Sequence, residues 1–124
     1  MNKIAYFYPR MEGLHTPVLE VPVPKGTTIS IPLALVVKVI IEDHASKYYC
    51  DISLNGKLII RSTLLDLTHV RLPGNNHTSG FVTKFNLQNI EPGQQSVFNL
   101  KLVDKFDNVF DESNYHIFFY EVPE

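Results

Sequence analysis

A run of acidic and amide side chains near the C-terminus is the first candidate for chemistry in this chain. Carboxylate and amide oxygens on the loops of a β-sandwich are ligands that Ca²⁺ accepts. Their spacing, however, lacks the central glycine and alternating acidic positions of an EF-hand loop. Asp and Asn also close turns by bonding to their own backbone. We expect turn chemistry here, with calcium binding as the alternative. The run comprises Asp104, Asp107, Asn108, Asp111 and Glu112.

The histidines show no pattern of metal ligands. None stands two or four residues from another in the sequence. His69 and His77 flank the Pro73-Gly74 turn and could converge there, but histidines on loops are more often solvated than bound to metal. We therefore expect no metal centre and no cofactor. The five histidines are His15, His44, His69, His77 and His116.

Glu42, Asp43 and His44 are neighbours in sequence and could suggest acid–base catalysis. Adjacent residues of an extended segment point apart, so their order does not make them a catalytic pair. The chain also lacks a Gly-x-Ser-x-Gly elbow, a phosphate-binding glycine loop and a zinc motif. We assign no catalytic residue and expect that the protein is not an enzyme.

Charge and cysteine usage narrow the partners and the compartment. The net charge is -2, and the Lys and Arg residues are scattered, which predicts neither a nucleic-acid nor a membrane partner. Cys50 is the only cysteine, so no disulfide forms within the chain, and we expect a small core residue there. No signal-like or membrane-spanning apolar run is found. These features predict a cytoplasmic protein.

Aromatic side chains gather in two triplets, one near each end of the chain. They are Tyr6-Phe7-Tyr8 and Phe118-Phe119-Tyr120. Successive strand residues face opposite sides of a sheet, so each triplet places aromatic surface on both sides. Apolar outer faces often mark interfaces. We therefore take Tyr6, Tyr8, Phe118 and Tyr120 as the candidate binding residues, with the loops around Asn75 to Ser79 as an alternative site.

Short β-rich runs bounded by Pro, Gly, Asn and Asp must position these residues. We expect about eight strands at roughly 10-residue spacing and no amphipathic helix, which is typical of a β-sandwich. Val18 to Val23 contains Pro22 and should be an edge segment, whereas Leu64 to Leu72 is ambiguous. The predicted strands are Lys3–Tyr8, Thr27–Ile31, Ala34–Glu42, Lys47–Leu54, Lys57–Ser62, Ser79–Gln88, Gln95–Asp104 and Tyr115–Val122.

The strand Ala34–Glu42 is apolar on both sides. Leu35, Val37 and Val39 share one side, and Val36 and Ile40 share the other. One side fills the core, and the other needs a cover. A second layer, the N-terminal arm, the proline-rich segment 17–24 or another protein chain could supply it.

A hairpin around Asn55-Gly56 is the strongest local signal, because both residues tolerate a positive φ. A two-residue loop pairs Ile52 with Ile59. A three-residue loop that includes Lys57 pairs Leu54 with Leu58 and Ile52 with Ile60, which places all four on one apolar side. We expect burial to decide the register through a bulge near Lys57.

Residues 34 to 122 resemble immunoglobulin-like and fibronectin-type sandwiches, including bacterial single-domain proteins of unknown function. The resemblance lies in the Asn55-Gly56 hairpin and in the run from Phe85 to Gly93 followed by Val97 to Asp104. It implies a single all-β domain over residues 1–124, an immunoglobulin-like antiparallel β-sandwich. Fold alone does not define function. Since the chain carries no catalytic motif, we expect a non-catalytic interaction domain. It would bind a protein partner or a second copy, as a homodimer, through a sheet face or edge strand. The alternative is a structural component of a phage or other assembly.

Overall fold

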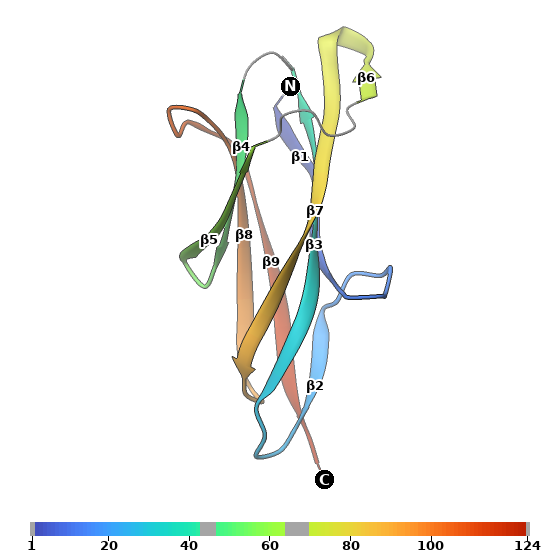
Figure 1. Ribbon diagram of the computed structural model, residues 1–124, viewed down its shortest axis with the longest axis vertical. Coiled ribbons are helices and arrows are strands. Elements are labelled where there is room, and N and C mark those ends of the chain that lie inside the picture. The colour runs from blue at the N-terminus through green and yellow to red at the C-terminus, as the bar shows by residue number, and fades with distance from the viewer. Residues whose placement is uncertain (1, 43–46, 64–69, 124) are drawn as a thin grey trace.

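The computed structural model describes residues 2–42, 47–63 and 70–123, in which nine strands and one short 3-10 turn are found. Figure 1 shows the longer strands running along the long axis of the molecule. No helix in these residues is long and apolar enough to cross a membrane. The elements are β1 (Lys3–Met11), β2 (Glu20–Pro24), β3 (Ile29–Ile41), β4 (Tyr48–Leu54), β5 (Lys57–Thr63), β6 (Val70–Leu72), η1 (Pro73–Asn75), β7 (Asn76–Ile90), β8 (Gln95–Asp104) and β9 (Val109–Val122).

Two sheets form an immunoglobulin-like sandwich, which confirms the predicted fold class. The first sheet has the order β1-β3-β7-β6, and the second has the order β2-β9-β8-β4-β5. In immunoglobulin lettering the first order corresponds to A-B-E-D, and β9-β8-β4 of the second corresponds to G-F-C. β5 is added beyond β4, and β2 is added beyond β9. Among the strands that the structure describes, all pairs are antiparallel except β2 with β9, which is parallel and departs from the expected arrangement.

The core lies between the sheets and follows the alternation of the sequence. Leu35, Val37 and Val39 of β3 point inward, as predicted, and so do Phe98, Leu100 and Leu102 of β8. Phe85 of β7 meets Phe98 edge to face across the sandwich, with ring centroids 6.2 Å apart. Aromatic edge-to-face contacts add to the burial of apolar surface, so this pair ties the two sheets together.

Several strands are longer than predicted, among them β3 and β9. β3 continues through Pro32, because the Pro32 carbonyl accepts a hydrogen bond from the Glu12 amide just past the end of β1, at 3.2 Å. The backbone nitrogen of Pro32 also faces β1, so the missing N–H of this residue removes no hydrogen bond to β7. β9 begins at Val109 instead of Tyr115, because β8 pairs with its polar first half through Lys101 and Glu112.

The proline-rich segment does not cover the outer side of β3. β2 joins the edge of the second sheet beside β9, which confirms an edge segment and corrects the idea that residues 17–24 fold over Val36 and Ile40. Those two side chains lie half-buried on the outer side of the first sheet. Of the expected ambiguous stretch 64–72, residues 64–69 lie outside the described residues and Val70–Leu72 form β6.

The hairpin satisfies turn chemistry and burial at different positions. Leu54 pairs with Lys57 across a plain two-residue turn, in which Asn55 and Gly56 have φ of 49° and 86°. The predicted pairing of Leu54 with Leu58 and the three-residue loop are therefore wrong. The register then shifts beyond Leu58, so that Ile59 is the extra residue and Ile52 faces Ile60 as predicted. A bulge two residues past the turn restores the buried side without changing the turn.

Candidate functional site

Tyr6 and Tyr8 lie side by side on the outer side of β1, at the edge of the first sheet. Phe7 between them is buried in the core, and the two tyrosine rings lie 5.9 Å apart at 37°. Tyr6 is 48% exposed. The alternation predicted for this triplet is therefore confirmed, and two tyrosines face outward from one strand.

Strand register extends this aromatic pair into an apolar row across the sheet. Tyr8 faces Val36 of β3, and Val36 faces Val82 of β7. Val82 is 56% exposed, which is high for a valine in the interior of a strand. We name the four residues Tyr6, Tyr8, Val36 and Val82 the tyrosine face. Sequence reasoning found Val36 but not Val82, because only the register shows that Val82 continues the row.

Gly80 shapes the neighbouring row of the same sheet. Tyr6 faces Lys38, and Lys38 faces Gly80. A Cβ on Gly80 would collide with the carbonyl oxygen of Val37 and would lie 3.1 Å from Cδ of Lys38. The missing side chain therefore lets the methylene chain of Lys38 lie close to the sheet, beside the tyrosines.

Cations surround the tyrosine face on the outer side of the first sheet. Arg10 faces Ala34, and Ala34 faces Lys84, one row below Tyr8 and Val36. The ammonium of Lys84 pairs with the Glu12 carboxylate at 2.9 Å, and the Arg10 guanidinium donates to the carbonyl of Leu14 at 2.9 Å. With Lys38 in the next row, this outer side is apolar at its centre and basic at its rim.

Phe118 and Tyr120 belong to the other sheet. They lie on the outer side of β9, 47% and 48% exposed, while Phe119 between them is buried. The parallel register places Pro22 beside Tyr120, and the Phe118 amide donates to the carbonyl of Leu19 at 2.9 Å. We name Leu19, Pro22, Phe118 and Tyr120 the aromatic patch. His116 stacks on Phe118, with ring centroids 6.2 Å apart.

The four sequence-derived binding residues therefore form two separate surfaces. The structure brings Tyr6 and Tyr8 together on the outer side of the first sheet, and it places Phe118 and Tyr120 on the outer side of the second. The alternative site around Asn75 to Ser79 is not a loop, because β7 begins at Asn76 and Ser79 is buried.

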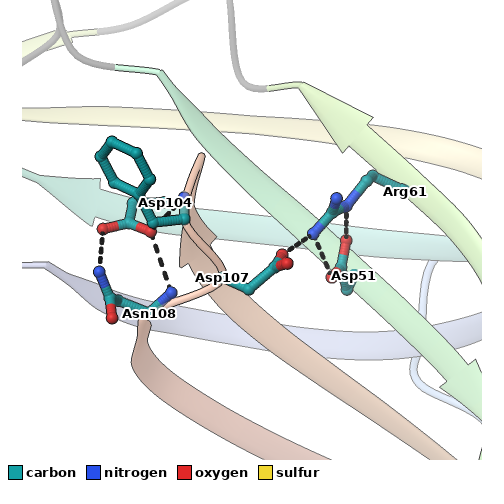
Figure 2. A network of polar contacts seen from close by, with 6 residues as sticks. Asp51, Arg61, Asp104, Asp107 and Asn108 are labelled. Carbon is teal, nitrogen blue, oxygen red and sulfur yellow. Dashed lines mark hydrogen bonds and ion pairs between the residues drawn. The ribbon is translucent and has the colours of Figure 1, made fainter.

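The acidic run near the C-terminus is used for turn and strand contacts. The Asp104 carboxylate accepts hydrogen bonds from the Phe106 amide at 2.8 Å, and from the amide and side chain of Asn108 at 2.9 and 2.8 Å. Figure 2 shows the two contacts with Asn108. These bonds, above all that from the Asn108 side chain, lower the pKa of Asp104. The predicted turn chemistry is thus confirmed at Asp104.

The other carboxylates of the run have separate donors. Asp107 pairs with Arg61, which also binds Asp51 at 2.7 Å and so joins β4 and β5 to the turn before β9 (Figure 2). Asp111 accepts the Ile4 amide of β1 at 2.8 Å. Glu112 accepts the side-chain amide of Asn99 at 2.6 Å. Among the described residues, no three His, Cys, Asp or Glu side chains are arranged to hold a metal ion.

Cys50 is fully buried in β4, as expected of a small core residue. Burial, and secondarily the charge of Asp51, raises the pKa of the Cys50 thiol to about 12. A thiol is nucleophilic only as thiolate, so this cysteine is chemically inert in the folded protein. Asp43, His44 and His69, which figured in the catalytic and metal hypotheses, lie outside the described residues.

No family model matches the chain, and no curated protein sequence matches it. Solved structures of similar shape include the fibronectin(III)-like modules of CbhA from Clostridium thermocellum, 11% identical, covering 98% of this chain and 99% of that one, with a TM-score of 0.40. Another is the CARDB domain of a Pyrococcus furiosus protein, 13% identical, covering 92% and 94%, with a TM-score of 0.46. The immunoglobulin-like assignment rests on the strand order of the two sheets.

Proposed function

We propose that this chain is a non-catalytic interaction module that binds a second copy of itself, or another protein, through the tyrosine face. The observation that carries this proposal is the row Tyr8, Val36 and Val82, which runs across three neighbouring strands on an outer side that no described element covers. Apolar outer surfaces of this kind are typical of interfaces, and tyrosine is enriched at their energetic centres.

The apolar centre and polar rim of the tyrosine face support a protein partner. Lys38 and Arg10 give the face a basic rim, while the chain as a whole carries a net charge of -2. An apolar centre with a polar rim is the usual anatomy of a protein interface. We further propose that the module acts in the cytoplasm and binds neither nucleic acid nor membrane.

The location of the aromatic patch supports a second candidate function, a structural component of a larger assembly. The tyrosine face and the aromatic patch lie on opposite outer sides of the sandwich. A contact between two copies of one face gives a closed dimer, whereas a contact between two different faces gives a ring or an open chain. Two faces on opposite sides permit the second kind of contact.

Sedimentation equilibrium over a range of protein concentrations tests both candidates. The double variant Tyr6→Ser, Tyr8→Ser should weaken self-association at least about tenfold, because each tyrosine at an interface centre contributes on the order of 1–2 kcal/mol. Phe106→Ser, at a 73% exposed aromatic residue in the turn before β9, is the matched control and should change nothing.

The aromatic patch decides between the two candidates. A closed dimer predicts that Phe118→Ser, Tyr120→Ser leaves association intact, because both copies then use the tyrosine face. An open assembly predicts that either double variant blocks growth, and that mixing the two variants yields a dimer and nothing larger. A wild-type protein that stays monomeric at the highest concentration contradicts self-association through either face.

A further inference from the structure

A groove opens between the two sheets at the end of β7. It has a volume of about 570 Å³, and its walls come from the last residues of β7, the β4–β5 turn and the start of β8. None of the residues that line it is charged, although 19% of the chain is. Leu54 and Phe85 offer half-buried apolar surface, and the rest of the accessible lining is largely amide side chains.

One wall of the groove is an open strand edge. Within the described part of the chain, β6 pairs with β7 only from Asn76 to Thr78, and beyond that point no described strand lies on this side of β7. An unpaired edge offers a row of backbone donors and acceptors to another extended chain. The edge ends at Asn89, where φ is 57° and the register with β3 shifts.

Pro32 shows which residues of β7 direct their backbone groups to this edge. Its carbonyl points to β1, where it accepts the Glu12 amide, so it is turned away from its partner Asn86. Pro32 and Asn86 therefore form a non-hydrogen-bonded antiparallel pair, in which both residues point their N–H and C=O groups away from each other. Asn86 therefore directs both groups to the open side, and by alternation Lys84 and Gln88 do the same.

Side-chain amides add further unused hydrogen-bonding groups. Among the contacts of the described residues, the side-chain amide groups of Asn86, Gln88 and Gln95 make no hydrogen bond, although all three residues line the groove. The remaining walls are fixed in place. Asn55 bonds to Val97 through its amide and its side-chain oxygen, both at 2.9 Å, and the Gln94 carbonyl accepts the Phe119 amide at 2.9 Å.

We propose that this groove binds an extended, uncharged peptide segment, which adds as a strand to the open edge of β7. From Lys84 to Asn89 the edge is about 20 Å long, enough for a strand of about six residues. Backbone pairing supplies affinity in such strand addition, and side-chain pockets supply selectivity. The uncharged lining disfavours ionic side chains, because a charge buried there would have no partner. The site meets the rim of the tyrosine face only at Lys84, and peptide binding there does not depend on the tyrosine face.

The groove favours a peptide over a neutral carbohydrate. Sugar rings need a flat aromatic surface for stacking, and the aromatic residue of this lining, Phe85, is turned inward against Phe98. The open backbone edge, in contrast, matches a polypeptide group for group. Binding of neutral oligosaccharides in place of peptides is therefore an outcome that overturns the assignment.

Selection from a random seven-residue phage-display library on the full-length protein tests the proposal. Enriched peptides should lack charged residues at alternate positions. Asn86→Pro should weaken their binding about tenfold by removing one outward N–H. Gln88→Lys should weaken it at least as much, by placing a charge in the groove. Asn114→Lys makes the same charge change on the outer side of β9 and should have no effect. A thermal melt of each variant confirms that it is folded.

Amide hydrogen exchange gives a second readout at single residues. On adding an enriched peptide, the amides of Lys84, Asn86 and Gln88 should become protected, whereas those of Phe85 and Leu87 are already paired with β3. Three results overturn the proposal: no enrichment over an unrelated protein, equal binding to the groove variants, or selective binding of oligosaccharides on a glycan array. Concentration-dependent protection of the same amides without peptide would also overturn it, because a second copy would then occupy the edge.

Discussion

The buried thiol of Cys50 makes stability depend on pH in a way that can be calculated. The pKa of this thiol is about 12 in the folded protein, whereas its ordinary value, which applies to the unfolded chain, is 9.0. Below pH 9 both states carry the neutral thiol, so its contribution to stability is complete. Between pH 9 and pH 12 the unfolded state loses the proton and the folded state keeps it, so unfolding becomes easier as the pH rises.

The size of this effect follows from the separation of the two values. The free energy of unfolding should fall by about 1.4 kcal/mol for each pH unit above 9, and thus by about 2 kcal/mol at pH 10.5. Lys and Tyr residues also titrate in this range. The variant Cys50→Ala isolates the thiol, because it keeps every other group and leaves only a pH-independent packing loss.

Urea unfolding of both proteins at pH 7 and pH 10.5 measures the effect. At pH 7 the wild type should be more stable than Cys50→Ala, and at pH 10.5 this difference should shrink by about 2 kcal/mol. A difference that stays constant between the two pH values would refute the reasoning, since it would mean that the thiol ionises as easily in the folded protein as in the unfolded one.

Three further predictions concern the fold and its turns. Gly56→Ala should lower the free energy of unfolding by about 1 kcal/mol, seen as a lower urea midpoint, because φ at this position is 86°. Phe98→Ala should cost about 3–5 kcal/mol in the same assay, since the ring is fully buried against Phe85, while Phe106→Ala should stay within about 0.5 kcal/mol of wild type. Asp104 has a lowered pKa, so its contribution is present above its ordinary value of 3.8 and is lost as the pH falls through the lower folded value. The stability difference between wild type and Asp104→Asn should therefore narrow below pH 4, and a difference that widens there would contradict the turn contacts.

Alternation and turn residues predict the strands that fill the core and the hairpin turn. Phe98, Leu100 and Leu102 alternate with polar residues, and this pattern gave both the strand and its buried side. Asn55-Gly56 predicts the turn, because Asn and Gly tolerate the positive φ that a two-residue hairpin turn needs. The Ile59 bulge was only approximately located, since its position depends on how β4 also pairs with β8.

Non-local pairing explains what the sequence could not predict. Tyr6 and Phe118 lie in strands of similar composition, and nothing near either residue indicates which sheet its strand joins. The same holds for β2, whose parallel pairing with β9 connects residues almost a hundred positions apart. The first half of β9 is not predicted as a strand, because Asp favours turns unless a neighbouring strand pairs with it, as β8 does with Asp111. The groove beside β7 likewise follows from the short pairing with β6.

The most direct test of the proposed interaction surface is a dilution series followed by ¹⁵N-resolved NMR of the wild-type protein. If the tyrosine face is the contact, amide signals of Tyr6, Tyr8, Val36 and Val82 should shift with protein concentration, and the shifts should vanish in the Tyr6→Ser, Tyr8→Ser variant. Concentration-dependent shifts confined to other strands, or signals that do not move at any concentration, would contradict self-association through this face.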